Sequence, residues 1–443
     1  MQLVGNGRLI THNPEVPYLD KGCVAFEGNA IADFGKTSDL VERYPGSSFY
    51  NARGRVIMPG LTNAHTHIYS AFARGFNLPQ KKPNKTFLQI LENVWWRLDK
   101  VLDTDDSLYS AYATGIECIR NGVTTIFDHH ASQFHIPGSL MAIEKALSNL
   151  GLRACLCYET TDRDGSEKTD EAIAENISYI DHAASSSMFR GMLGMHASFT
   201  LSQETIEKCV DAMGDRDAGF HIHCAEGPED QADCLEKHGK RVLERLRDSG
   251  VLGRKTIAVH NIHASDTEIS ILKDTNTMAV HNPESNMGNA VGCARVLDMV
   301  SSGVTLGLGT DAYASDMFES LKVANLIHKH ELKDPGVAFS ESVGMLFKGN
   351  TEICSRFFPN PIGVIAKGAA ADVIVVDYTP HTPMDETNCY GHIMFGISGK
   401  CVDTVFIGGS CVMKDRVLIT VDEDGILSRS REQAADFWKR VVG

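Results

Sequence analysis

Short apolar runs recur along the middle of the chain, and each ends in polar or ionisable residues. They are GLTNAHTH, GVTTIFDHH, LRACLCYET, MLGMHASFT, GFHIHCAE, KTIAVHNIH, TMAVHNPES and VTLGLGTDA. Amphipathic segments such as TDDSLYSAYATGIECIRNG separate most of them, so strands alternate with helices. Such alternation builds βαβ units with parallel strands, and eight units predict an α/β fold, a (β/α)8 TIM-type barrel over residues 58–359.

The two ends of the chain have a different pattern from the middle. Residues 1–57 and 360–425 contain short strand-like runs separated by glycine turns, as in GVIAKGAAADVIVVD. We expect both ends to combine into one small composite β-sandwich domain, with Pro59 and Gly60 marking the entry into the barrel. Residues 426–443 have the pattern of a C-terminal helix.

Composition excludes several classes of partner. The net charge of −15 and the pI of about 5.6 argue against binding to nucleic acid or to an anionic membrane surface. No apolar run reaches the length of about 18 residues that a membrane helix needs, and the N-terminal residues lack the pattern of a secretory signal. The 12 cysteines are scattered without a C-x-x-C pair, which favours reduced thiols and a cytoplasmic protein.

The first apolar run ends in two histidines, His65 and His67, with one residue between them. Because side chains alternate along a strand, both imidazoles face the same side and can bind one divalent ion. Such a pair alone is more typical of strand-end histidines bonded to the backbone. Distant partners are therefore needed before a metal site is inferred.

The run GFHIHCAE offers such partners. His221 and His223 share a face, so periodicity does not choose between them, but His223 lies nearer the end of the strand. We expect the strand to end near Ala225, which would swing Glu226 to the mouth of the barrel.

Three later runs end in His260, His281 and Asp311. The carboxyl ends of barrel strands meet at one face, so these side chains are expected near the histidine pair. Asp311 could instead cap the following helix. Three imidazoles and one carboxylate suit Zn2+, and Fe2+ or Mn2+ are also compatible.

Several segments, in order, resemble motifs of the amidohydrolase superfamily, in its cytosine deaminase and ATZ/TRZ (atrazine chlorohydrolase-like) branch: VIMPGLTNAHTH, HIHCAE, HNPESNM, GLGTD and GAAADVIVVD. NVWWRLDKVLD, CYETTDRDG and GTDAYASDMFE are similar to SsnA-type aminohydrolases. The resemblance covers nearly the whole chain and implies a homodimer. Because the fourth run has no lysine to become a bridging carbamate, it also implies a single metal ion.

The resemblance implies a role for each matching residue. Glu226 would transfer protons, and His260 would orient the attacking water. Asp311 would accept the proton of that water and would also be a metal ligand. The implied metal ligands are His65, His67, His223 and Asp311, and the candidate substrate-binding residues are His196, His281, Trp96, His129 and Glu319.

Two departures from the family pattern affect the expected substrate. The segment HASFT has Ser198 where related proteins carry proline, which changes the shape of that loop. Ala312 follows Asp311, whereas related nucleoside deaminases carry glycine there, so adenosine-type substrates are disfavoured.

We therefore expect a metal-dependent hydrolase that deaminates a small N-heterocycle such as a pterin, purine or pyrimidine. Water activated by the metal would attack the carbon while Glu226 protonates the adjacent nitrogen. One alternative is a non-deaminating hydrolase, a dechlorinase or an amide hydrolase, at the same site. A more distant alternative is a catalytically inert scaffold protein, which would have no need to retain all four ligands beside Glu226 and His260.

Overall fold

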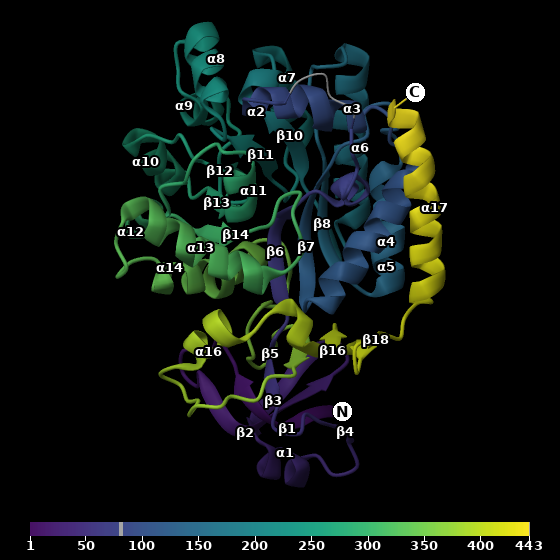
Figure 1. The fold of residues 1–443 in the computed structure, drawn as a ribbon, viewed down its shortest axis with the longest axis vertical. Coiled ribbons are helices and arrows are strands. Elements are labelled where there is room, and N and C mark those ends of the chain that lie inside the picture. Colours follow the sequence, from purple (N-terminus) through teal and green to yellow (C-terminus); the bar gives the residue numbers. More distant parts are fainter. Residues whose placement is uncertain (79–82, 443) are drawn as a thin grey trace.

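The computed structural model describes residues 1–78 and 83–442, and it has two parts (Figure 1). A mixed β-sheet forms the lower part of the view, and a ring of parallel strands surrounded by helices forms the upper part. Within the described ranges, no helix is both long and apolar enough to cross a membrane.

The strands of the upper part are parallel and lie in two sheets. The sheets contain β6 (Leu61–Thr66), β7 (Val123–His130), β8 (Arg153–Tyr158) and β9 (Phe189–Gly191), and then β10 (Leu193–Ala197), β11 (Phe220–Cys224), β12 (Ile257–His260), β13 (Met278–His281) and β14 (Leu306–Leu308).

Backbone hydrogen bonds join these two sheets at both seams. The amide of Thr160, just after β8, donates to the carbonyl of Gly194 on β10 (3.0 Å). At the other seam the amide of Thr310 donates to the carbonyl of His65 on β6 (3.0 Å). Only Met192 separates β9 from β10, so they are two halves of the fourth strand. The strands thus follow one another around the barrel that the repeated runs predict.

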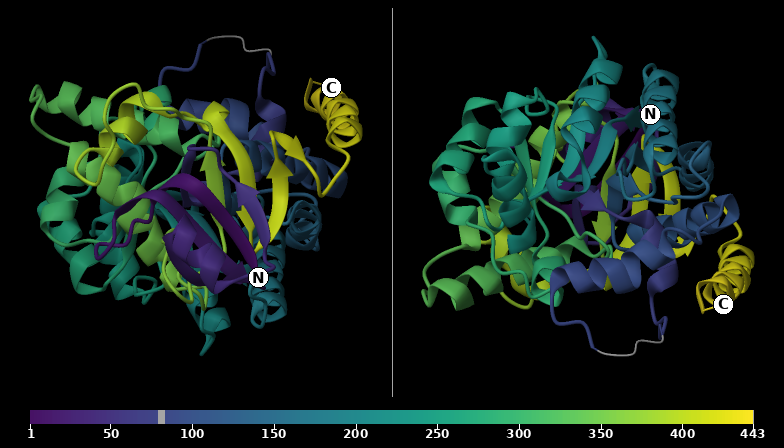
Figure 2. Two further views of the ribbon diagram at one scale, coloured as in Figure 1. Left: turned by 90° about the horizontal axis from the view of Figure 1, so that it is seen from below. Right: turned by 90° about the horizontal axis from the view of Figure 1, so that it is seen from above.

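Helices connect successive strands and surround them (Figure 2, right). They are α4 (Thr104–Arg120), α5 (Ser139–Leu150), α6 (Ser166–Ala183), α7 (Gln203–Met213), α8 (Pro228–His238), α9 (Val242–Asp248), α10 (Asp266–Asp274), α11 (Pro283–Gly288), α12 (Val296–Ser301), α13 (Met317–Leu332), α14 (Phe339–Val343), η4 (Gly344–Gly349) and α15 (Asn350–Ser355). Their inner faces and the apolar strand residues form one buried core, with Ile126, Leu147 and Ile222 among its members. This core holds the strand ends in fixed positions.

The lower part is a nine-stranded sheet built from both ends of the chain (Figure 2, left). Its strands are β1 (Gln2–Ile10), β2 (Tyr18–Glu27), β3 (Ala30–Lys36), β4 (Ser48–Asn51), β5 (Val56–Pro59), β15 (Val373–Val376), β16 (Val402–Ile407), β17 (Ser410–Lys414) and β18 (Val417–Leu418). The short helices α1 (Thr37–Arg43), α16 (Cys389–Gly396) and η5 (Gly399–Cys401) accompany it. Because β5 pairs with β1 and β15, the chain leaves this sheet at Gly60, where Pro59 and Gly60 are predicted to mark the entry into the barrel, although the predicted terminal segment ends at residue 57, two residues before the end of β5.

The C-terminal helix α17 (Glu423–Val442) lies along the side of the barrel against α4 (Figure 1). It begins three residues before the predicted position, because the side chain of Asp422 accepts a hydrogen bond from the amide of Gly425 (3.2 Å) and caps the first turn. Near its other end, the indole of Trp438 donates to the carbonyl of Phe72 (2.6 Å).

The segment after β6 passes over the carboxyl ends of the barrel strands. It contains η1 (Ile68–Ala73), α2 (Phe87–Ile90), the π-helix η2 (Leu91–Trp95) and α3 (Trp96–Leu98). Long loops at this face of a barrel often enclose the site below them.

A buried ion pair connects the two parts of the molecule. Arg153 begins β8, and Asp372 directly precedes β15. The guanidinium donates to both carboxylate oxygens, and the amide of Gly408 donates to Asp372 Oδ1 (2.8 Å). The side chains are only 4% and 1% exposed, so neither charge has access to water that would replace its partner.

Asp372→Ala is expected to lower the free energy of unfolding by about 3–5 kcal/mol, because it leaves the Arg153 charge buried without a partner. The matched control is Asp377→Ala, five residues on, whose side chain is 62% exposed beside Arg55. Its cost is expected to be at most about 1 kcal/mol. Denaturant unfolding measures both values, and equal losses would contradict the prediction.

Candidate active site

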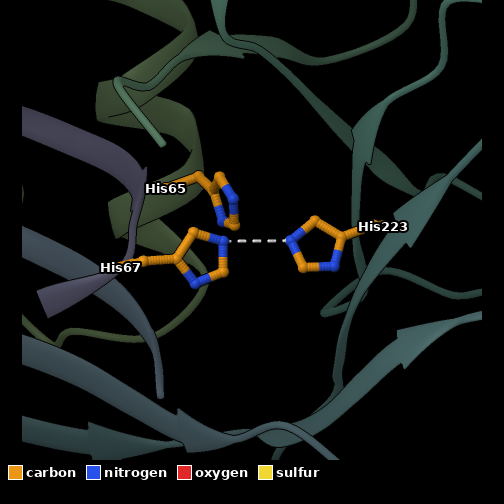
Figure 3. Close-up of side chains that lie close together, drawn as sticks. All are labelled: His65, His67 and His223. Atoms are coloured by element: carbon orange, nitrogen blue, oxygen red, sulfur yellow. Dashed lines mark hydrogen bonds between the residues drawn. The ribbon is translucent and has the colours of Figure 1, made fainter. Parts of the chain in front are cut away.

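Three imidazoles converge at the carboxyl ends of the barrel strands (Figure 3). His65 lies on β6, His67 directly follows that strand, and His223 lies on β11. Each offers one ring nitrogen, and these nitrogens all lie within 4.8 Å of one another. The three side chains are buried, so they meet in the interior of the barrel rather than at the surface.

The hydrogen bonds of His67 and His223 determine which nitrogen faces the centre. Their Nδ1 atoms donate to the carbonyls of His129 (2.6 Å) and His196 (2.8 Å). A neutral imidazole carries one proton, so both Nε2 atoms present lone pairs. These two Nε2 atoms are 3.2 Å apart. Facing lone pairs repel each other unless a cation lies near both, so the pair fits a metal ion whose ligands are oriented through their second nitrogens.

His65 adds a third nitrogen to the cluster. Its Nε2 is buried and has no hydrogen-bond partner in the described part of the chain. Its Nδ1 lies 2.9 Å from Nε2 of His221. His223 therefore reaches the cluster, whereas His221 supports His65 from behind, a distinction that strand periodicity could not make.

Asp311 supplies a carboxylate to the same cluster. It follows β14, and its Oδ1 lies 3.2 Å from Nε2 of His67. Ser285 Oγ donates to the other oxygen (2.6 Å). The alternative role as a helix cap does not apply, because Asp316 caps α13. The carboxylate is thus held in place by its neighbours and faces the imidazoles.

Glu226 and His260 lie beside this cluster. Strand β11 ends at Cys224, and Ala225 adopts a left-handed conformation (φ 49°) that turns Glu226 into the mouth of the barrel, as the sequence predicts. His260 Nε2 lies 3.4 Å from Glu226 Oε2 and 3.6 Å from Asp311 Oδ2.

Burial governs the ionisation of both residues. Burial and the charge of Asp311 raise the pKa of Glu226 well above its ordinary value. Burial lowers the pKa of His260, even though Asp311 opposes the shift. The arrangement favours a protonated carboxyl next to a neutral imidazole, which is suited to proton transfer.

A cavity opens above the cluster and is closed on one side by the segment after β6. His196 and Trp96, two of the predicted substrate-binding residues, line it, and so does Trp95. Other lining residues are Tyr69, Phe87, Leu88, Leu91, Asp99, Glu159, Phe199, Glu229, Ser285, Asn289, Ala312 and Tyr313. The apolar and aromatic residues among them suit a planar ring.

Three predicted substrate-binding residues do not line this cavity. His129 is fully buried, and its Nε2 contacts the carbonyls of Met195 and His221 inside the barrel. His281 points outward and packs against His328 of α13, with ring centroids 5.1 Å apart. Glu319 is exposed in the first turn of α13. Direct substrate contact does not fit these positions.

Sequence reasoning assigned no role to Asp99 or Arg163. Arg163 Nη2 donates to Asp99 Oδ2 (2.9 Å) and lies 3.4 Å from Glu159 Oε1. Burial alone raises the pKa of Glu159, but the charges of His196, His129 and Arg163 outweigh it and hold the pKa below its usual range. The sequence signal for Arg163 was the group of ionisable residues in ETTDRDG, at the end of the third apolar run.

Glu159 also belongs to two clusters that overlap the first one. It groups with His67 and His129, and separately with His196 and His223, again with ligand atoms within 4.8 Å of one another. Arg163 lies beside Glu159 and supplies a positive charge, so no metal ion is needed there to balance the carboxylate. The cluster of His65, His67, His223 and Asp311 therefore remains our candidate metal centre.

Comparisons with known proteins identify sequences and folds that this chain resembles. A 5-methylthioadenosine/S-adenosylhomocysteine deaminase from Thermococcus sibiricus is 32% identical over 89% of this chain and 90% of its own length. A zinc-bound adenosine deaminase from Xanthomonas campestris has the same fold, with a TM-score of 0.88, 22% identity and coverage of 99% of this chain and 98% of its own. An atrazine chlorohydrolase from Arthrobacter aurescens, complexed with zinc, superimposes with a TM-score of 0.84 at 22% identity, over 98% of this chain and all of its own.

The sequence profile of the amidohydrolase family matches residues 56–412, which include every strand of the barrel and all four candidate metal ligands. Together with the relative at 32% identity, this match shows that the chain belongs to the amidohydrolase family.

Proposed function

We propose that the protein hydrolyses the exocyclic C–NH2 bond of a small N-heterocycle and releases ammonia. Deamination is the reaction named for its deaminase relative, and the fold is that of the amidohydrolases. The observation that carries the proposal is the position of Glu226, a carboxyl whose pKa burial raises, 3.4 Å from His260 at the edge of the imidazole cluster. A proton donor at that point can reach both the substrate ring and the attacking water.

The residues of the cluster would hold one divalent ion, Zn2+, through His65, His67, His223 and Asp311. Their donor set is the one that zinc prefers in hydrolases, and the Xanthomonas campestris and Arthrobacter aurescens structures contain zinc. When bound, the ion lowers the pKa of water toward 7 and so provides a nucleophile at neutral pH.

Each neighbouring side chain has a distinct task in this proposal. Glu226 protonates the ring nitrogen next to the carbon that carries the amino group, which makes that carbon electrophilic. Asp311 accepts the proton of the attacking water, and His260, whose Nδ1 proton is directed at Asn286 Oδ1 (2.8 Å), orients that water through the lone pair of Nε2. Asp311 then passes the proton it received to the amino group, Glu226 recovers a proton from the added hydroxyl as the C=O bond forms, and the C–N bond breaks to release ammonia.

Two observations bear on which class of substrate the protein accepts. The Thermococcus sibiricus relative is named for adenosine derivatives, whereas Ala312 lines the cavity at the position where nucleoside deaminases carry glycine. We therefore include adenosine and methylthioadenosine beside pterins, other purines, pyrimidines and triazines as candidate substrates.

An ammonia-release screen over these compounds with zinc-loaded enzyme tests the proposal. We expect at least one heterocycle to be turned over, with loss after chelation and recovery on zinc addition. Release of chloride from a chlorotriazine without ammonia from any amine would instead establish the dechlorinase alternative. Turnover that is unchanged after complete removal of metal would overturn the metal assignment.

Two further expectations belong to this proposal. The protein is expected to act in the cytoplasm on its small-molecule substrate, and to be a homodimer. The mass in solution, measured by light scattering, tests the dimer, and a monomer at assay concentration would contradict it.

A further inference from the structure

The cavity next to the candidate metal centre is rich in carboxyl groups. Its described lining includes the carboxyl groups of Asp99, Glu159, Glu226, Glu229, Asp230 and Asp311, and no lysine or arginine among the residues that the structure describes there. Glu226 and Asp311 have tasks at the reacting atoms. Asp99 and Glu159 do not, and they belong to the wall formed by the segment after β6 and the loop after β8.

Asp99 lines this cavity and has one carboxylate oxygen without a donor among the described residues. The residue is 1% exposed, and its Oδ2 accepts a hydrogen bond from Arg163 Nη2 (2.9 Å). Its Oδ1 is buried and has no hydrogen-bond partner among the described residues. A buried carboxylate oxygen without a donor is costly, so this atom is suited to accept a hydrogen bond from a bound molecule.

Glu159 competes with Asp99 for the same positive charge. Its Oε1 lies 3.4 Å from Arg163 Nη2, and its Oε2 lies 3.3 Å from Nδ1 of His129. Two carboxylates therefore share one guanidinium, and Glu159 also has His129 as a partner, so excess negative charge is expected on the Asp99 side of the wall. Little water reaches it to screen that charge, because Glu159 is only 4% exposed.

Arg163 is a positively charged group close to this wall, and by itself it would favour a substrate that carries an anion. Its Nη1 has no partner in the described part of the chain, so a substrate anion could in principle be attracted to it. However, Arg163 does not line the cavity, and its guanidinium lies over the ring of Trp96, 4.7 Å from the centroid. An anion that approached it would also approach Asp99 and Glu159, and repulsion between like charges at short range is poorly screened in a buried site.

We propose that this wall, formed by Asp99, Glu159 and Arg163, makes the enzyme select neutral or cationic heterocycles whose edge away from the metal carries N–H donors. Substrates with a carboxylate or a phosphate on that edge are rejected. The inference rests on the proposed deamination and adds to it the charge class of the substrate.

Matched pairs of compounds test this selectivity. Pterin and pterin-6-carboxylate differ only in one carboxylate, and adenosine and adenosine 5′-monophosphate differ only in one phosphate. Burial raises the pKa of Asp99 to about 6 although Arg163 opposes the shift, so assays at about pH 8 keep it ionised. We expect kcat/KM of the neutral member to exceed that of the anionic member by about 100-fold or more.

Asp99→Asn should reduce this preference by at least about tenfold, because Arg163 would then face one carboxylate instead of two. KM for the neutral member should rise while kcat changes less than about threefold, since Asp99 does not contact the reacting atoms. Asp99→Glu retains the charge and should retain the preference. The matched control is Asp170→Asn, an exposed aspartate on α6 paired with Lys208, which should leave both values unchanged.

The outcomes separate this inference from the proposed function. Equal turnover of both members, or a preference for the anionic one, would overturn the charge selectivity while leaving the deaminase proposal intact. If no compound releases ammonia, the deaminase proposal fails. Calorimetric binding of the same pairs to the zinc-loaded enzyme then still decides the charge preference, with weaker binding of the anionic member expected.

Discussion

Replacement of Glu226 by glutamine is expected to lower kcat for ammonia release by about 10²–10⁴-fold, while the metal content and the fold are retained. Glutamine has the shape of the carboxyl but cannot donate and accept the same proton. The side chain lies 3.4 Å from His260, and burial raises its pKa, so its proton is available at the pH where the chemistry must occur.

A control on helix α8, which follows Glu226 in the chain, tests whether the loss is specific. Glu236→Gln alters an exposed glutamate of α8, remote from the cavity lining, and should leave kcat within about twofold of the wild type. Metal analysis of both variants confirms that the loss is not caused by an empty site. If Glu226→Gln retained near wild-type turnover on the best substrate, Glu226 would not be the proton-transfer residue.

His223→Ala is expected to abolish tight metal binding and activity, because it removes one of the three converging imidazoles. His221→Ala should keep the stoichiometry but weaken metal affinity by about 10–100-fold, because His221 contacts the outer nitrogen of His65 at 2.9 Å. The two residues lie on the same strand and differ only in which of them reaches the cluster.

Metal analysis and zinc titration of the purified proteins measure this contrast. The wild type should contain close to one ion per chain, since the fourth strand has no lysine to bridge a second ion. Two tightly bound ions would overturn the single-metal prediction and would point to the overlapping clusters around Glu159. Loss of metal from His221→Ala with retention in His223→Ala would reverse the assignment of the two histidines.

The barrel was predictable because its signal is local and repeated. Each strand run ends in a polar residue and is followed by an amphipathic segment, so every βαβ unit carries its own periodicity. The boundaries were less accurate. β5 continues to Pro59 because it gains hydrogen bonds from β15, more than 300 residues later, and no local pattern encodes that pairing.

The convergence of the imidazoles was also predictable, since alternation places His65 and His67 on one face and barrel strands present their carboxyl ends together. The directions in which the later strand-end histidines point were not predictable. His281 ends its strand as His260 does, yet it packs outward against His328, whereas His260 adopts a left-handed conformation (φ 69°) and turns inward. Such a conformation is uncommon for residues other than glycine and depends on surrounding contacts.

The sequence by itself therefore determined the fold class, the family and the histidine pair at the end of the first barrel strand, because period, order and residue type are properties of short segments. Only the tertiary structure decided which histidine of GFHIHCAE reaches the cluster and which nitrogen of each imidazole faces it. It also decided that Asp99 and Glu159 share Arg163 across the cavity wall. These features depend on contacts between residues tens to hundreds of positions apart, which the close packing of the core holds in place.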